Sequence, residues 1–262
     1  VRLLATICTF RREVYVNKTL DSISEMLSDP SYGLDCDIEV VVVDNGRTLA
    51  ENWHDRHNLY LIPNRNLGGS GGFARGMYEA LRRNKTHTLL MDDDETVDPN
   101  VLYKTLNLLR VIREEYSDAQ ILGGMLLNDD PTVQYEAGSR NLNRIKGDLD
   151  FLDRNSLREN EVEEPIDYGA WWYLCFPSEI AKDNLPIPFF IRMDDVEFGL
   201  RNASSRIIMN GMGIWHDNFA NKSNKVVEYY YTERNSMYTW AIHGVRTHPF
   251  SSRYWVKTDR KS

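Results

Sequence analysis

The alternation of strand-like and helix-like segments over the first 127 residues is the feature that most constrains the fold of this chain. Short runs rich in Val, Ile and Leu predict buried strands at 3–9, 38–43, 59–62, 88–91 and 121–127. The segments between them carry apolar residues at helical spacing and predict helices at 14–27, 74–83 and 99–116. We therefore expect an α/β fold of βαβ units, with a mostly parallel central sheet flanked by helices.

The second half of the chain is less regular. A polar, turn-rich stretch at 128–165 predicts hairpins and a mobile loop at 148–164, and we expect ordered structure to resume at 168–176. The remaining expected elements are helices at 178–184, 194–203 and 226–244 and short strands at 207–209 and 213–215. We expect this half to elaborate the same sheet instead of forming a separate domain.

Composition excludes several classes of protein. The 262 residues include 31 Lys and Arg against 39 Asp and Glu, a net charge of −8, so the basic footprint of a nucleic-acid binder is missing. No apolar run approaches the ~18 residues of a membrane span, and no signal peptide opens the sequence. Three widely spaced cysteines without a CxxC pair favour a reducing cytoplasm. Because the sequence begins at Val1 inside a strand-like run, we expect it to be part of a longer chain.

Polar side chains follow the predicted strands of the first half. Thr9, Asp44, Asn64 and Asp92 each lie at the carboxyl end of one of them. Ligands of open α/β sheets bind outside these strand ends, so we expect the functional site there.

The run Asp92, Asp93, Asp94 follows a buried strand directly. In extended backbone alternate side chains point the same way, so Asp92 and Asp94 can share one divalent cation. Three adjacent carboxylates also repel each other unless a positive charge lies among them. The alternative is an exposed acidic turn, with Asp98 capping the next helix. His216 could complete a mixed oxygen and nitrogen site for Mn²⁺ or Mg²⁺, although a single histidine is more often structural.

A glycine-rich run at 68–72 precedes a predicted helix. Glycines let backbone approach an anion closely, and the N–H groups at a helix N-terminus favour phosphate. Residues 69–74 also satisfy a loose G-x-G-x-x-A dinucleotide pattern. The alternatives are a substrate-lining loop and a plain flexible turn.

Two residue pairs in the second half have both a structural and a functional interpretation. Asp194 with Glu197 resembles a helix capping box, and a carboxylate here could also serve as a general base. The two roles are compatible, because one of Asp194 and Asp195 could cap the helix while the other acts as the base. Trp171 and Trp172 offer flat apolar faces suited to sugar rings, although buried tryptophans usually belong to a core.

Taken together in chain order, these motifs resemble those of the inverting GT-A glycosyltransferases of family 2. Among these, they are most similar to the bacterial galactofuranosyltransferases that build galactan. The segments that carry the resemblance are 8–12, 42–46, 66–77, 91–94, 171–172, 190–201 and 214–216.

The resemblance implies a GT-A fold with a Rossmann-like sheet and a single catalytic domain over 1–262. Residues 1–127 would bind the nucleotide sugar, and 128–262 would bind the acceptor and carry the catalytic group. The implied partners are a UDP-sugar, taken to be UDP-galactofuranose, and a glycan or glycolipid acceptor. Such an enzyme of cell-surface polysaccharide synthesis would be cytoplasmic and could work at the inner face of the plasma membrane without spanning it.

The resemblance also assigns roles to individual residues. Asp195 would be the catalytic base, and Asp194 would orient a substrate hydroxyl or cap the helix. The metal ligands would be Asp92, Asp94 and His216, with Mn²⁺ or Mg²⁺ as cofactor, and Trp171 and Trp172 would face the acceptor. The residues implied to bind the nucleotide or donor are Thr9, Phe10, Arg11, Asp44, Asn66, Gly69, Ser70, Gly71, Asp92 and Asp93.

Three other functions remain open at this point. The nearest is another family 2 inverting transferase that uses a rhamnosyl or galactosyl donor. An NAD(P)-dependent oxidoreductase would account for the glycine pattern, but ribose recognition needs one acid and not three. A non-catalytic sugar-nucleotide-binding module would bind UDP without releasing it from a donor.

Overall fold

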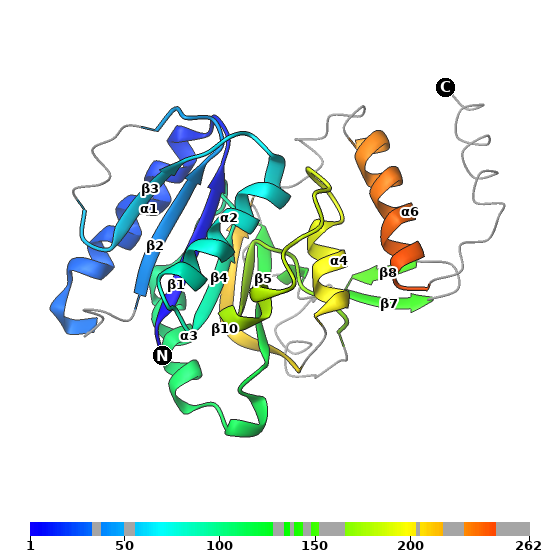
Figure 1. Cartoon of the computed structure of the whole chain (residues 1–262). Coiled ribbons are helices and arrows are strands. Elements are labelled where there is room, and N and C mark those ends of the chain that lie inside the picture. The colour runs from blue at the N-terminus through cyan, green and yellow to red at the C-terminus, as the bar shows by residue number, and fades with distance from the viewer. Residues whose placement is uncertain are drawn as a thin grey trace.

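The computed structural model describes residues 1–32, 38–49, 56–127, 134–136, 139–143, 148–151, 166–202, 205–216 and 228–244. Most of its strands form one eight-stranded sheet (Figure 1). In spatial order, seven of these strands are β10 (Arg206–His216), β5 (Gln120–Leu127), β9 (Tyr173–Pro177), β4 (His87–Met91), β1 (Leu3–Thr9), β2 (Ile38–Asp44) and β3 (Leu59–Pro63). The eighth, β6 (Gln134–Glu136), pairs with β5, while β7 (Ser139–Asn143) and β8 (Asp148–Phe151) pair with each other.

Helices flank the central sheet. The α-helices are α1 (Glu13–Ser28), α2 (Gly68–Arg82), α3 (Pro99–Val111), α4 (Asp194–Arg201) and α6 (Glu233–Ile242). Shorter helical turns are η1 (Pro30–Tyr32), η3 (Glu114–Tyr116), η5 (Ser178–Lys182) and the π-helical η7 (Glu228–Thr232). None of the helices in the described ranges is long and apolar enough to cross a membrane.

Strand pairing confirms the predicted mostly parallel α/β sheet. Strands β3, β2, β1 and β4 are parallel neighbours, and β10 is parallel to β5. Among the described strands of this sheet, only β9 and β6 run antiparallel to their neighbours. Because β9 and β10 come from the second half of the sequence, that half extends the same sheet (Figure 1).

Alternation along β1 explains how the sheet is covered on both faces. Leu3 and Ala5 belong to a buried cluster with Leu20 of α1, to which α3 also contributes. Leu4, between them in sequence, belongs to a different cluster with Ala80 of α2. Helices α1 and α3 therefore cover one face and α2 the other, which leaves the carboxyl ends of β1 and β4 open to a ligand.

Helix α2 begins at Gly68, whereas the sequence predicted a loop at 68–72 and a helix only from residue 74. The glycines are needed for close packing of this helix on β1. A Cβ atom at Gly72 would lie 2.1 Å from Cys8 Sγ, and one at Gly76 would lie 1.9 Å from Thr6 Cγ2. The tertiary contact thus overrides the low helix propensity of glycine.

Other element boundaries also differ from the prediction. The helix expected at 99–116 ends at Val111, and η3 follows as a separate turn. The two strands expected at 207–209 and 213–215 are the single strand β10, with an irregular register between Ile208 and Gly213. The final helix divides into η7 and α6, and much of the 128–165 stretch, with its predicted hairpins, lies outside the described residues.

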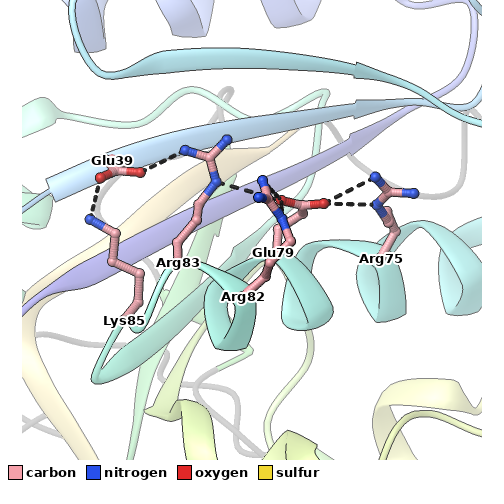
Figure 2. Close-up of polar contacts among 6 residues, drawn as sticks. All are labelled: Glu39, Arg75, Glu79, Arg82, Arg83 and Lys85. Carbon is pink, nitrogen blue, oxygen red and sulfur yellow. Dashed lines mark hydrogen bonds and ion pairs between the residues drawn. The ribbon is translucent and has the colours of Figure 1, made fainter.

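A network of ion pairs joins the end of α2 to the sheet (Figure 2). Glu79, which is 2% exposed, accepts paired hydrogen bonds from Arg75 and from Arg82. Arg83 lies next to Glu79 and also contacts Glu39 on β2, whose second carboxylate oxygen accepts from Lys85. The network therefore ties helix α2 to strand β2.

Replacing Glu79 with Gln is expected to lower the free energy of unfolding at pH 7 by roughly 1–3 kcal/mol, because buried charge-assisted hydrogen bonds are lost. Burial alone would raise the pKa of Glu79, but the hydrogen bonds from Arg82 and Arg75 outweigh it and lower the pKa. The contribution of Glu79 is thus present above its unfolded pKa of about 4.3 and is lost as the pH falls through the folded-state pKa.

Urea unfolding between pH 7 and pH 3 measures this effect, and the difference between wild type and E79Q should shrink in acid. Glu179→Gln is the control, because Glu179 pairs with Lys182 at an exposed site where ion pairs contribute little. Equal stability of E79Q and wild type at pH 7 would contradict the assignment.

Candidate active site

A cleft of about 640 Å³ opens at the carboxyl ends of β1, β4 and β10. It is lined by strand ends, by the start of α2 and by the segments at 170–172 and 190–195. The predicted site residues that line it are Thr9, Phe10, Asn66, Gly69, Asp92, Asp93, Asp94, Trp171, Trp172, Asp194, Asp195 and His216. Four others that the sequence singled out do not line it, namely Arg11, Asp44, Ser70 and Gly71.

One part of the cleft combines carboxylates with an imidazole. His216 Nε2 lies 3.3 Å from Asp94 Oδ1, and both side chains are buried. Burial, then the charges of Asp94 and Asp93, raise the pKa of Asp92 to about 7, while the charge of His216 acts in the opposite direction. Carboxylates and an imidazole suit Mn²⁺ or Mg²⁺, and the accumulated negative charge would be neutralised by a divalent cation.

The expected metal ligands Asp92, Asp94 and His216 are not grouped closely enough to hold an ion. Within the described ranges, no three His, Cys, Asp or Glu side chains are grouped so that they could hold an ion. The guanidinium of Arg12 instead contacts Asp94 and lies 3.3 Å from Asp93 Oδ1. The chemistry of the donor groups therefore fits a divalent cation, while the cation present among these carboxylates is an arginine.

Arg12 is a cleft residue to which the sequence analysis gave no role. The neighbouring Arg11 was expected to contact the donor, but it has a left-handed backbone and its guanidinium lies 5.2 Å from the centre of the Phe10 ring. The sequence did contain an indication of such a residue, because three adjacent carboxylates require a nearby positive charge.

Asp194 lies at the first position of α4 and does not cap it. Met193 occupies the N-cap position with a φ of 64° and makes no side-chain capping hydrogen bond, so the interpretation of Asp194 as the N-cap of a capping box is wrong. The Asp194 carboxylate instead accepts a hydrogen bond from Ser70 Oγ at 3.0 Å. Burial and the charge of Asp195 raise the pKa of Asp194 to about 7.

Asp195 is partly buried and faces the cleft. Its Oδ1 accepts a hydrogen bond from the backbone N–H of Val196 at 2.8 Å. Burial raises the pKa of Asp195, opposed by that hydrogen bond and by the charge of Arg192. A carboxylate whose pKa is raised toward neutrality is suited to accept a proton.

The start of α2 packs against the segment that leads into α4. Gly68 has a φ of +71°, and a Cβ atom there would lie 1.9 Å from the carbonyl oxygen of Phe190. Gly69 lines the cleft, whereas Ser70 is buried behind it and Gly71 contacts Leu67. The positive end of the α2 dipole thus lies beside the cleft, where it favours an anionic group.

Asp44 was expected to bind the nucleotide or donor, but its carboxylate accepts hydrogen bonds from nearby backbone groups. Its oxygens accept hydrogen bonds from the backbone N–H groups of Gly46, Thr48 and Leu49. The next residue, Asn45, lines the cleft and donates a hydrogen bond to the carbonyl oxygen of Gly68. Asn45 belongs to the motif at 42–46, but no individual role was predicted for it.

The two tryptophans are largely buried. Trp171 is 4% exposed and packs edge-to-face against Phe73 and Phe198, and Trp172 is 7% exposed. Trp172 Nε1 donates a hydrogen bond to the carbonyl oxygen of Gly123, whereas Trp171 Nε1 has no hydrogen-bond partner among the described residues. Both tryptophans therefore line the cleft as largely buried side chains and do not offer two open faces.

Comparison with known proteins identifies the family. The model of the family described as glycosyltransferase like family 2 matches residues 2–206. The galactofuranosyltransferase GlfT2 of Mycolicibacterium smegmatis is 27% identical over 241 residues, which cover 78% of this chain and 36% of that protein. GlfT2 of Mycobacterium tuberculosis is 30% identical over 200 residues, which cover 68% of this chain and 31% of that protein. The chain thus spans about a third of the length of these relatives.

A solved structure supports the same fold. Glucosyl-3-phosphoglycerate synthase from Mycobacterium tuberculosis, in complex with Mn²⁺, UDP-glucose and phosphoglyceric acid, superposes with a TM-score of 0.51 at 12% identity. The match covers 91% of this chain and 78% of that one. This likeness confirms the expected GT-A fold. With a family model that matches most of its length, the chain belongs to glycosyltransferase like family 2.

Proposed function

We propose that this protein transfers galactofuranose from UDP-galactofuranose to a hydroxyl group of a growing glycan, with inversion and with help from Mn²⁺ or Mg²⁺. The observation that carries the proposal is that Asp92, Asp94 and His216 line the same cleft as Asp194 and Asp195. The similarity to two enzymes named galactofuranosyltransferases supports the donor sugar. The neighbour in complex with Mn²⁺ and UDP-glucose supports a UDP donor and a metal.

The diphosphate of the donor would lie between the start of α2 and the acidic strand end. The α2 dipole favours negative charge there, and Arg12 supplies a guanidinium within the same cleft. Asp92, Asp94 and His216 would hold the divalent cation. When bound, that cation acts as a Lewis acid that neutralises charge on the departing UDP.

Asp195 would act as the general base. Its carboxylate takes the proton from the acceptor hydroxyl, and the oxygen forms a bond to the anomeric carbon from the face opposite UDP. The bond between that carbon and the phosphate oxygen breaks, and UDP leaves with the electron pair. One displacement inverts the configuration, so no protein nucleophile is required.

Trp171 is the tryptophan better placed to meet the acceptor. It lines the cleft, and because its indole N–H is buried, the ring would make the contact with a sugar. Trp172 already uses its N–H on Gly123, so we assign it a packing role next to Trp171.

Incubation with UDP-galactofuranose, Mn²⁺ and a panel of galactosides, followed by mass spectrometry, tests the proposal. The expected product is a galactoside heavier by one hexose residue, formed only with the galactofuranose donor. Transfer from a rhamnosyl or galactopyranosyl donor alone would replace the proposed substrate. Tight UDP binding without transfer from any donor would favour a non-catalytic sugar-nucleotide-binding module.

A further inference from the structure

Three of the four residues that lead into α4 have left-handed backbone conformations without being glycine. Phe190 has a φ of 76°, Arg192 of 69° and Met193 of 64°. Such conformations are unfavourable for residues with side chains, and they persist only where the surrounding structure enforces them. This segment places Asp194 and Asp195 at the cleft. The contacts that stabilise its conformation therefore also position these two carboxylates.

Hydrogen bonds to the backbone carbonyl groups of this segment show which residue stabilises its conformation. The side-chain Nδ2 of Asn235 on α6 lies 2.8 Å from the carbonyl oxygen of Ile191 and 2.9 Å from that of Arg192. It lies 3.3 Å from the carbonyl oxygen of Phe189. An amide NH₂ has two hydrogens, so the two shorter contacts are its main hydrogen bonds and the third is shared.

Arg234 fixes the orientation of the Asn235 amide. Its Nε donates a hydrogen bond to Asn235 Oδ1 at 2.8 Å, and its guanidinium also donates to the carbonyl oxygen of Phe189 at 2.7 Å. A flipped amide would place Oδ1 against the loop carbonyls and Nδ2 against a guanidinium, so only one orientation is compatible with both sets of partners. Asn235 is completely buried, which makes each of these hydrogen bonds costly to leave unmade.

We propose that Asn235 is a positioning residue, which holds the segment at 189–193, with its three left-handed residues, in place and thereby aims Asp194 and Asp195 at the substrates. The assignment of a catalytic role to these aspartates rests on the proposed function. The contribution of Asn235 acts through backbone carbonyls, and no motif of the sequence analysis includes it.

Asn235→Ala is the test variant, and Thr239→Val is its matched control. Thr239 lies one turn further along α6, is equally buried, and its hydroxyl has no hydrogen-bond partner among the described residues. N235A should lower kcat by ~10²-fold through misplacement of the base, with the KM for the donor changed less than about threefold. T239V should keep both parameters near wild type.

Hydrogen exchange separates this inference from the proposed function. Mass spectrometry should show exchange of the amides at 189–196 accelerated by roughly tenfold or more in N235A, with β1 unchanged. T239V should leave this segment unchanged. This readout needs no sugar donor, so inactivity of the wild type with UDP-galactofuranose would affect only the proposed function.

Either of two results would overturn the inference. One is unchanged exchange at 189–196 in N235A, and the other is an equal loss of kcat in N235A and T239V. If N235A does not fold, Asn235→Ser, which keeps one hydroxyl donor, takes its place with the same expected direction and the same criteria.

Discussion

Asp195→Asn should reduce the turnover of sugar transfer by about 10²–10⁴-fold, because an amide cannot accept the proton of the acceptor hydroxyl. The substitution keeps the size of the side chain, and the Asn oxygen can still accept the N–H of Val196 that Asp195 Oδ1 accepts now. Folding and UDP affinity should therefore remain close to those of the wild type. Initial-rate kinetics and calorimetric titration with UDP measure the two quantities separately.

The pH dependence of the wild type provides an independent check of Asp195. Burial raises the pKa of this carboxyl group, so the base is deprotonated above that raised pKa and kcat/KM should fall as the pH drops through it. Asp183→Asn, at an exposed acid outside the cleft, is the control and should retain full activity. Loss of turnover in Asp194→Asn together with near-normal turnover in D195N would assign the base to Asp194.

Removing divalent metal should reduce activity to background, and added Mn²⁺ should restore it. Asp92, Asp94 and His216 share a buried, negatively charged part of the cleft, where the diphosphate would otherwise meet carboxylates of the same sign. Without a divalent cation the donor would be repelled and the leaving UDP left without charge neutralisation. Activity in EDTA and the Mn²⁺ dependence of UDP binding are the measurements.

Asp94→Asn should weaken Mn²⁺ binding by more than the ~10–100-fold that loss of an outer-shell partner costs, because one of the proposed ligands is removed. Asp98→Asn is the control within the same acidic stretch, because Asp98 caps α3 through the N–H of Asn100 and does not line the cleft. Full activity in EDTA would remove the metal from the mechanism. Equal Mn²⁺ affinity in D94N and D98N would move the metal site elsewhere.

The parallel strands of the first half could be predicted from the sequence to within one or two residues. Strand β1 begins at Leu3 and ends at Thr9 as expected, and β2 continues only one residue further than predicted, to Asp44. These strands are buried on both faces, so they consist of largely apolar runs that end where polar residues begin. This pattern of apolar and polar residues depends only on neighbours in the sequence, so it can be recognised without the tertiary structure.

Helix α2 was predicted only in part, because its first turn depends on distant contacts. Glycine disfavours a helix by about 1 kcal/mol relative to alanine, so a run of glycines indicates a loop when judged locally. In the folded chain the same glycines allow the helix to approach Cys8 on β1 and the backbone of Phe190. Packing between residues far apart in sequence decided this boundary.

The acidic motifs of the site were likewise visible in the sequence, whereas their partners were not. Asp92 and Asp94 were recognisable because of their spacing after a buried strand, and Asp195 because of the resemblance to family 2 enzymes. Nothing near Asp194 in sequence indicates that Ser70, 124 residues away, would donate a hydrogen bond to its carboxylate. Asn235 belongs to no recognisable motif, and its proposed role is evident only from the carbonyl groups that it contacts in the folded chain.

Periodicity and residue type alone determined the alternating α/β architecture, the edge of the sheet where ligands bind and the presence of a carboxylate-rich site. The folded chain decided which arginine faces the acids, where α2 starts, and how the left-handed segment before α4 is held in place. The physical reason is that strand and helix patterns follow from each residue's immediate neighbours in sequence. Charge pairing and hydrogen bonding to strained backbone depend on groups that only folding brings together.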